Sequence, residues 1–384
     1  MKKRILLLDT NFSAKPIYDY LIKTGAEVFV VGGNPEDALA KSAKNYINLD
    51  YSKISELKAL IKDLAVDYLV PGGNDFSYKI CSEINTDFNF CNIDSIEVEQ
   101  IIDDKEKFRK FTSKINLHVP RIIESDQIKD FLPVIVKPVD AYSGRGMTIV
   151  YEVNNDKIAE AINLAKKFSK SQKYIIEEFV QGQLYSHSAF IVDGEIMIDF
   201  IVEEHCIVNP YVVDTSRVVF NFDKNILKQI RNDITLFAKR LNLADGLMHT
   251  QFICDGNTFW LIEANRRCPG DLYSKLIEYS TGFPYAEYYA RPFINETNKI
   301  SNFEIVKSNV FRHTVTVGVK GIFNSISISS PINILEFTPL SLTGDRIEES
   351  PFSRIGLMFG YLSSESDLLQ LINKAINRTL YSIN

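Results

Sequence analysis

Residues 248–267 read MHTQFICDGNTFWLIEANRR, with two apolar segments on either side of the dipeptide Asp255-Gly256. An Asp-Gly pair between apolar segments is typical of the turn in a β-hairpin. We therefore predict an antiparallel hairpin over residues 247–265. Because side chains alternate along a strand, Glu263 and Asn265 point to the same face of it.

A third oxygen donor, Gln251, joins that face if the hairpin loop holds an odd number of residues. Phe252, Trp260 and Ile262 then share the opposite face. Three oxygen donors on one face suit Mg²⁺, which prefers carboxylate, amide and phosphate oxygens. The alternative is the polar outer face of an edge hairpin.

Two arginines directly follow these donors, at positions 266 and 267. A metal ion beside cationic side chains is what a polyphosphate undergoing transfer requires. The arginines therefore favour a phosphoryl-transfer site over a simple solvated hairpin face.

A second segment runs from Val134 to Gly146. A buried-type strand ends in Lys137-Pro138, and a loop of small residues, Ala-Tyr-Ser-Gly-Arg-Gly, follows at 141–146. Glycines let backbone N–H groups approach phosphate oxygens, and a lysine at a strand end supplies a positive charge. The alternative is an ordinary β-turn that happens to follow a lysine.

A third segment, Tyr174 to Gly182, is an apolar strand that ends in Glu177-Glu178. Such a strand end can offer backbone groups and one acceptor to an adenine amino group. Taken alone the pattern is weak, because most glutamate pairs at strand ends are simply solvated.

The first hundred residues alternate short apolar strands, at 4–8, 28–31 and 68–70, with helical patterns. This alternation predicts a parallel α/β sheet. The first turn, residues 9–13, contains no glycine, so the GxGxxG phosphate loop is absent and NAD or FAD binding is not expected. We interpret residues 1–100 as a scaffold domain that supplies one wall of a site.

Together these segments resemble the ATP-grasp superfamily, most closely its carbamoyl-phosphate-synthetase-like and amino-acid-ligase branches. The similarity covers residues 101–295. The motifs that carry it are Asp104-Lys105, Ile135-Val136-Lys137-Pro138 with the glycine flap, Glu177 to Gly182, Glu263 to Arg267, and Thr281-Gly282-Phe283-Pro284.

The resemblance implies an α/β and α+β protein. A parallel α/β pre-ATP-grasp domain (1–100) would precede an ATP-grasp fold of two α+β subdomains. These would be a lid with its entry helix (101–183) and a core (184–300). Residues 301–384 would form a C-terminal extension packed on the core, and closure of residues 112–183 would exclude water from the site.

The resemblance also implies the roles of individual residues, with ATP held between two antiparallel sheets. The residues assigned to ATP are Lys105, Lys137, Ser143, Gly144, Arg145, Gly146, Glu177, Glu178, Phe179 and Val180. Gln251, Glu263 and Asn265 would bind one or two Mg²⁺ ions, with Mn²⁺ as a possible substitute. Lys137 and Arg267 would be catalytic, and Arg266, Asp271 and Arg312 would contact substrate.

Three positions depart from the family pattern. Leu184 stands where members often carry a glutamate for the ribose hydroxyls, which leaves ribose binding open. The familiar Asn-Pro-Arg is here Asn265-Arg266-Arg267, which adds a cation. Gln251 replaces a carboxylate, as in some relatives, and lowers the negative charge of the metal site.

The activity that the resemblance implies is ATP-dependent ligation of a carboxylate to an amine through an acyl phosphate, with an amino acid as the preferred substrate. Two alternatives stay open. One is another ATP-grasp reaction, such as carboxylation through carboxyphosphate. The other is a non-catalytic ATP sensor, suggested only by the missing ribose glutamate.

Composition limits the partners. The 384 residues include 43 Lys+Arg and 49 Asp+Glu, a net charge of −6, which argues against nucleic acid as a partner. No apolar stretch approaches the ~20 residues that span a bilayer, so no membrane role is expected. Five cysteines without a CxxC pair fit reduced thiols in a cytoplasmic protein, and a homodimer is the default oligomer.

Overall fold

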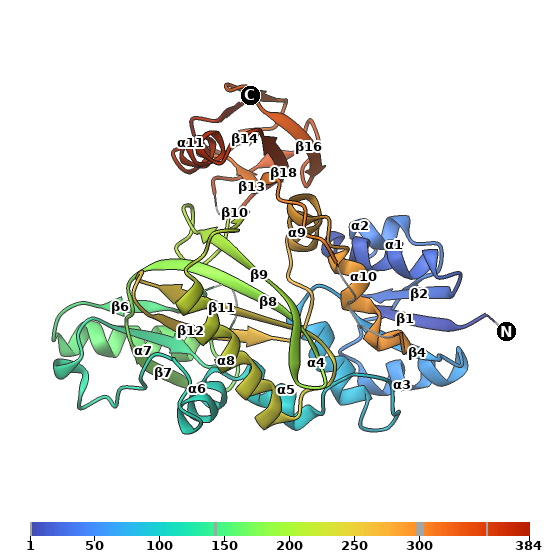
Figure 1. Ribbon diagram of the computed structural model, residues 1–384, viewed down its shortest axis with the longest axis horizontal. Helices are drawn as coiled ribbons and strands as arrows, with labels where there is room; N and C mark the ends of the chain where they lie inside the picture. The colour runs from blue at the N-terminus through green and yellow to red at the C-terminus, as the bar shows by residue number, and fades with distance from the viewer. Residues whose placement is uncertain (1, 142–143, 297–302, 351) are drawn as a thin grey trace.

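The computed structural model describes residues 2–141, 144–296, 303–350 and 352–384. A small parallel sheet opens the chain, a three-stranded lid follows, and a long antiparallel sheet fills the centre of the molecule (Figure 1). The combination of a parallel α/β unit with an antiparallel α+β unit confirms the predicted fold class.

The N-terminal sheet has the strand order β3-β2-β1-β4, and its strands are all parallel. Its elements are β1 (Arg4–Leu8), α1 (Lys15–Lys23), β2 (Glu27–Gly32), α2 (Ala38–Ser42), β3 (Tyr46–Asn48), α3 (Ile54–Asp63), β4 (Tyr68–Pro71) and α4 (Asp75–Ile84). The apolar runs that predicted β1 and β4 are buried between helices, as expected for a parallel sheet covered on both faces. The carboxyl end of β4 leads into α4, which reaches the site described below.

Two short helices connect this sheet to the lid: α5 (Ile96–Asp103) and α6 (Lys105–Lys114). Asp104 separates them because its backbone is extended there, and its side chain accepts a hydrogen bond from the backbone N–H of Lys107. This N-cap places Lys105 at the first position of α6.

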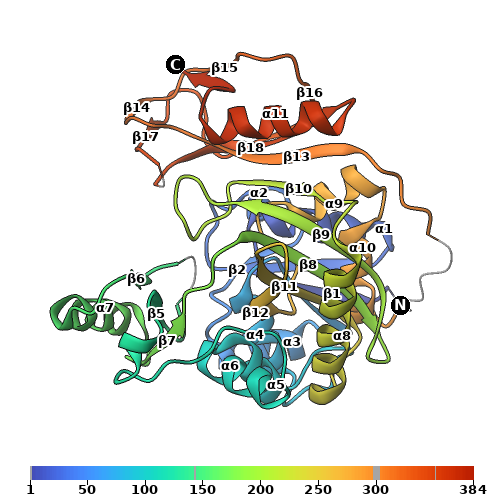
Figure 2. The ribbon, with the colours of Figure 1, turned by 60° about the vertical axis from the view of Figure 1, so that its left-hand side comes forward.

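The lid is a three-stranded antiparallel sheet with the order β6-β5-β7, which projects from the body of the molecule (Figure 2). Its elements are β5 (Val134–Pro138), β6 (Thr148–Val150), α7 (Asn155–Phe168) and β7 (Tyr174–Glu178). Val134, Val136, Ala161 and Ala165 belong to a hydrophobic cluster confined to this unit. This three-stranded unit therefore has a hydrophobic core of its own.

The central sheet has eight strands in the order β12-β11-β8-β9-β10-β13-β18-β16. Its elements up to residue 290 are β8 (Gln183–Val192), β9 (Glu195–His205), β10 (Thr215–Val218), α8 (Lys224–Leu241), β11 (Gly246–Cys254), β12 (Phe259–Asn265), α9 (Tyr273–Thr281) and α10 (Tyr285–Ala290). Asp223 caps the N-terminus of α8, and Asn242 ends it in the left-handed conformation. The apolar face of α8 packs on this sheet.

Three strands from the last part of the chain extend the same sheet. The elements there are β13 (Asn309–Thr316), β14 (Gly321–Ile322), β15 (Ile326–Ile328), β16 (Asn333–Pro339), β17 (Arg346–Ile347), β18 (Arg354–Leu362), α11 (Glu365–Ile376) and β19 (Tyr381–Ile383). β10 pairs with β13, and α11 lies along β13 and β18 (Figure 2). The C-terminal residues are therefore joined to the core by backbone hydrogen bonds as well as by side-chain packing.

The N-terminal sheet and the central sheet share one hydrophobic cluster. It runs from β1 and α1 through α10 to Phe190 and Phe359 of the central sheet. Helix α10 contacts both α1 and β11, which fixes the two units against each other. No helix among the described residues has the length and apolar character to cross a bilayer.

Candidate active site

The hairpin β11–β12 carries the proposed metal ligands, and a β-bulge sets its register. The loop between Cys254 and Phe259 holds four residues, an even number, which alone would put Gln251 out of step with Glu263. A register shift between Gln251 and Phe252 supplies the missing residue, so Gln251 lies directly opposite Glu263. The three donors therefore share a face, although for a different reason from the one predicted.

The four-residue loop also corrects the prediction for the other face of the hairpin. Phe252 pairs with Leu261, and both pack in the core together with Phe259. Trp260 pairs instead with Ile253, and Ile262 lines the site pocket. The expectation that Trp260 and Ile262 share a face with Phe252 depended on an odd number of loop residues, and the four-residue loop places Leu261, not Trp260 or Ile262, beside Phe252.

Arg109 of α6 holds the bulge in place. Its guanidinium donates to the carbonyl oxygens of Leu261 at 2.8 Å and of Ile262 at 3.0 Å. The backbone N–H of Leu261 donates to the carbonyl of His118 at 2.7 Å. These bonds satisfy backbone groups that a bulge leaves without cross-strand partners.

The donor set fits a hard cation such as Mg²⁺. The amide nitrogen of Gln251 donates to the carboxylate of Glu204 at 2.7 Å, which leaves the amide oxygen of Gln251 for a ligand. Asn265 Oδ1 is buried and has no hydrogen-bond partner in the part of the chain that the structure describes, an arrangement that is costly unless something else binds it. Among the described residues no group of three His, Cys, Asp or Glu is placed to hold a metal, and two of these three predicted ligands are amides.

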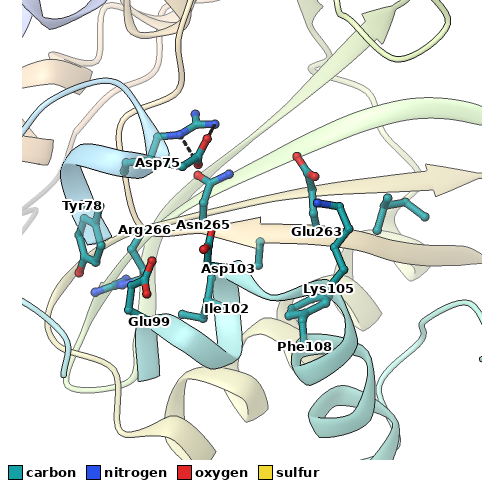
Figure 3. Close-up of a pocket in the computed structure, with 13 residues that line it drawn as sticks. Asp75, Tyr78, Glu99, Ile102, Asp103, Lys105, Phe108, Glu263, Asn265 and Arg266 are labelled. Carbon is teal, nitrogen blue, oxygen red and sulfur yellow. Dashed lines mark hydrogen bonds and ion pairs between the residues drawn. The ribbon is translucent and has the colours of Figure 1, made fainter. Parts of the chain in front are cut away.

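A pocket of about 60 Å³ brings together five of the predicted site residues (Figure 3). Its predicted members are Lys105, Glu263, Asn265, Arg266 and Arg267. They come from α6 and from β12 with the turn after it, segments far apart in the sequence. Asp75 of α4 and both Glu99 and Asp103 of α5 complete the walls, and the sequence analysis assigned a role to none of the three.

Asp75 orients the predicted catalytic arginine. Arg267 Nε and Nη2 lie 2.7 and 3.1 Å from the two carboxylate oxygens of Asp75, a two-pronged contact that fixes the plane of the guanidinium. Asp75 is the first residue of α4, whose N-cap is Asn74. The loop after β4 therefore positions a catalytic candidate.

Arg266 has a different role from the predicted substrate contact. Its guanidinium is buried, pairs with Asp94 at 2.6 Å and donates to the carbonyl oxygens of Leu247 and Ala244. All three nitrogens are thus engaged with protein groups. The geometry assigns Arg266 to holding the segment before α5 against the central hairpin.

Lys137 forms a buried ionic triad with Glu177 and Arg109. Lys137 Nζ lies 2.6 Å from one oxygen of Glu177, and Arg109 Nε lies 2.8 Å from the other. Although burial alone would raise the pKa of Glu177, the charges of Arg109 and Lys137 lower that pKa to about 2. The triad joins two lid strands to α6 and, through Arg109, to the bulge.

The segment predicted to hold adenine lies at the end of β7, and its two carboxylates are engaged. Glu177 belongs to the triad, and Glu178 accepts from the backbone and side chain of Arg121 at 3.0 and 3.1 Å. Phe179 contacts the ring of Tyr151 edge-on, and Val180 follows it. Adenine binding by this segment stays a prediction.

The predicted glycine flap lies between the lid and the core. Gly144 and Gly146 have φ values of +68° and +75°, which glycine adopts without strain, and Arg145 between them is exposed. A Cβ at Gly144 would lie 2.0 Å from that of Tyr211. Ser143 lies outside the described residues. Lys105 Nζ donates to the carbonyl of Ala141 at 2.7 Å, which ties α6 to the start of the flap.

The other predicted substrate residues, Asp271 and Arg312, lie together. Arg312 donates to the carbonyl of Asp271 at 3.2 Å and to the hydroxyl of Ser216 at 3.0 Å, while its Nε is buried without a hydrogen-bond partner in the described structure. Arg354 of β18 pairs with the carboxylate of Asp271 at 2.8 Å. The last part of the chain thus contributes a cation beside these residues.

Glu204, for which no motif predicted a role, connects this cluster to the proposed metal ligand Gln251. It is buried on β9, and burial raises its pKa even though Arg312 lies near it. It lies directly across the β8–β9 pair from Leu184, the position where a ribose glutamate was expected. Arg109 was also missed, although its spacing of four from Lys105 on one helix face was visible in the sequence.

Residues 131–275 match the model of a family described as the ATP-grasp domain. The chain contains an ATP-grasp domain. This finding confirms the resemblance stated from the motifs, and the match includes both the lid sheet and the hairpin of the metal ligands.

Among curated proteins, this chain is similar to the carbamoyl phosphate synthase large chain of Methanospirillum hungatei. The two are 28% identical over 167 residues, which are 43% of this chain and 15% of that protein. The chain therefore spans about a sixth of the length of this curated relative.

Two solved structures show the same fold over the whole chain. One is an L-amino acid ligase from Bacillus licheniformis, with a TM-score of 0.81 and 14% identity, covering 100% of this chain and 98% of that chain. The other is the biotin carboxylase domain of 2-oxoglutarate carboxylase from Hydrogenobacter thermophilus, described as a dimer in complex with MgADP and bicarbonate. Its TM-score is 0.76 and its sequence identity is 15%, and the match covers 100% of this chain and 91% of that chain.

Proposed function

We propose that this chain is an ATP-dependent ligase that joins a carboxylate to an amine through an acyl phosphate, with an amino acid as one substrate. The observation that carries the proposal is the convergence of Lys105, Glu263, Asn265 and Arg267 on one pocket, with Gln251 opposite Glu263. Oxygen donors and cations placed together are what a polyphosphate under transfer requires.

In the first step a carboxylate oxygen of the substrate attacks the γ-phosphorus of ATP, and ADP leaves. Lys105 and Lys137 bind phosphate oxygens, and Glu177 fixes the position of Lys137. Arg267, oriented by Asp75, stabilises the charge on the phosphoryl group. Mg²⁺ (one or two ions, or Mn²⁺) held by Gln251, Glu263 and Asn265 would neutralise charge on the transferring group.

In the second step the amine nitrogen attacks the carbonyl carbon of the acyl phosphate. A C–N bond forms, the C–O bond to phosphate breaks, and the nitrogen loses a proton. The lid, which has its own hydrophobic cluster, closes over the site and keeps water from hydrolysing the acyl phosphate. The chain supplies positioning and charge rather than a covalent nucleophile.

Support for an amino acid substrate comes from the similarity to the L-amino acid ligase over the full chain. The buried Arg312, with one nitrogen lacking a hydrogen-bond partner in the described structure, is a candidate for binding a substrate carboxylate. The shared fold alone does not choose between ligation and carboxylation.

A substrate panel tests the proposal. Purified protein with MgATP is combined with pairs drawn from the twenty L-amino acids and simple carboxylates, and ADP and phosphate are measured. We expect at least one pair to raise ADP release about tenfold or more above that of ATP alone, with a new amide detected by mass spectrometry. ADP release that needs bicarbonate and gives no amide would support carboxylation instead, and ATP binding without any stimulated hydrolysis would contradict the ligase proposal.

A further inference from the structure

Helix α5 presents a buried carboxylate to the site pocket. The side chain of Glu99 is only 5% exposed, and its Oε2 has no hydrogen-bond partner among the described residues. Glu99 nevertheless lines the pocket that contains Glu263, Asn265 and Arg267 (Figure 3). A carboxylate oxygen buried without a partner is costly unless a ligand provides one.

The cations near Glu99, Lys79 and Lys107, offset its charge only in part. Its charged lining residues are the acids Asp75, Glu99, Asp103 and Glu263 and the cations Lys105, Arg266 and Arg267. Three ion pairs join Asp75 to Arg267, Arg266 to Asp94 and Asp103 to Lys79. Glu263 is the proposed metal ligand, so Glu99 is the acid for which the proposed machinery offers no positive charge.

The pKa of Glu99 reflects the same imbalance. Burial and the nearby carboxylates of Asp103 and Asp75 raise this pKa to about 8, although the charges of Lys79 and Lys107 act in the opposite direction. A positively charged group bound in the pocket would relieve both the burial cost and this repulsion.

The walls of the pocket indicate which cation fits. Glu99 and Asp103 lie four residues apart and so share one face of α5. Ile102 and Phe108 line the pocket beside them. Two acids next to apolar side chains suit an organic amine, whose N–H groups bind the carboxylates while its carbon atoms contact the apolar residues. A hydrated divalent ion would find fewer oxygen ligands at this wall of the pocket than it needs to complete its coordination shell.

We propose that Glu99, assisted by Asp103, binds the ammonium group of a substrate in this pocket. The inference rests on the proposed ligase function and specifies how that site recognises one substrate. The ammonium group could belong to the attacking amine or to the α-amino group of the amino acid whose carboxylate is activated. Either source presents the same R–NH₃⁺ chemistry to Glu99.

The test compares Glu99→Gln, which keeps the shape but removes the charge, with Glu97→Gln on the exposed side of α5. With the best substrate pair from the panel, we expect Glu99→Gln to raise KM for one amine-bearing substrate about 10- to 100-fold, the range expected for a lost hydrogen bond to a charged group. KM for ATP should stay within twofold, and Glu97→Gln should match the wild type. Glu99→Asp, which retains the charge, should recover part of the loss.

Hydroxylamine, which is mostly uncharged at neutral pH, separates the two sources. If Glu99 binds the attacking amine, Glu99→Gln should still form hydroxamate from the activated carboxylate at the wild-type rate. If Glu99 binds the α-amino group of the activated substrate, hydroxamate formation should show the raised KM. An unchanged KM for every substrate in both assays would overturn the inference, while hydroxamate formation by the wild type would leave the ligase proposal standing.

A binding measurement needs no turnover. Melting temperatures are recorded with the twenty L-amino acids, methylamine and putrescine, each against its N-acetyl derivative. The wild type should be stabilised by at least one free amine and not by its acetylated form, and Glu99→Gln should lose that difference. Equal shifts for free and acetylated forms in the wild type would refute ammonium recognition, even if the protein proved to be a ligase.

Discussion

Replacing Glu263 with glutamine is expected to lower ATP-dependent turnover by about 10²- to 10³-fold. The carboxylate is the single formal negative charge among the three proposed metal ligands, because Gln251 and Asn265 are amides. Its loss would leave a neutral donor set that holds a divalent cation weakly. The measurement is kcat for ADP release with the best substrate pair from the panel, at increasing Mg²⁺ concentrations.

The fold should survive this substitution. No hydrogen bond or ion pair of the Glu263 carboxylate is found within the described residues, so glutamine removes no structural contact. Glu160→Gln, on the exposed face of α7 in the lid, is the matched control and should retain both activity and melting temperature. Wild-type activity in a folded Glu263→Gln protein would refute the metal assignment.

Replacing Glu177 with glutamine is expected to reduce the free energy of unfolding by about 3–5 kcal/mol. Glu177 is fully buried between Arg109 and Lys137, and its removal leaves two buried cations without a counter-charge. Urea denaturation followed by circular dichroism measures the loss. Glu178→Gln is the neighbouring control, because its partner Arg121 is exposed and such pairs contribute about 0–1 kcal/mol.

The same triad predicts a pH dependence. The folded-state pKa of Glu177, about 2, lies below its ordinary value of 4.5, so the stabilisation is complete above pH 4.5 and is lost as the pH falls toward 2. Glu177→Gln should lack this part of the acid-unfolding profile. Parallel profiles for wild type and variant between pH 4.5 and 2 would show that the triad contributes nothing to stability.

Much of the fold was predictable because the spacing of apolar residues along a segment indicates which of its faces is buried. The alternation of strands and helices before residue 100 predicted the parallel sheet. Asp255-Gly256 lies in the turn of the expected hairpin. The pairing of the last part of the chain with the central sheet was not predictable, because it depends on contacts between β10 and β13, which are far apart in the sequence.

The residue types of the site could be predicted from the sequence, but their arrangement in space could be predicted only in part. The convergence of Gln251 with Glu263 depends on a bulge, which no local residue signals, and on Arg109, which stabilises the bulge from another helix. Arg266 and Arg267 are adjacent in sequence and chemically identical, yet after the end of β12 one pairs with Asp94 and the other with Asp75. Only the tertiary partners distinguish the structural arginine from the catalytic candidate.

The most direct test of an acyl-phosphate ligase follows the carboxylate oxygens. The carboxylate substrate is labelled with ¹⁸O in both oxygens and incubated with the protein, MgATP and the amine, and the released phosphate is analysed by mass spectrometry. Attack of the carboxylate on the γ-phosphorus predicts that each phosphate released with the amide carries one ¹⁸O atom. Phosphate without the label would mean that an oxygen other than one from the substrate carboxylate attacks the γ-phosphorus, and would contradict the proposed function.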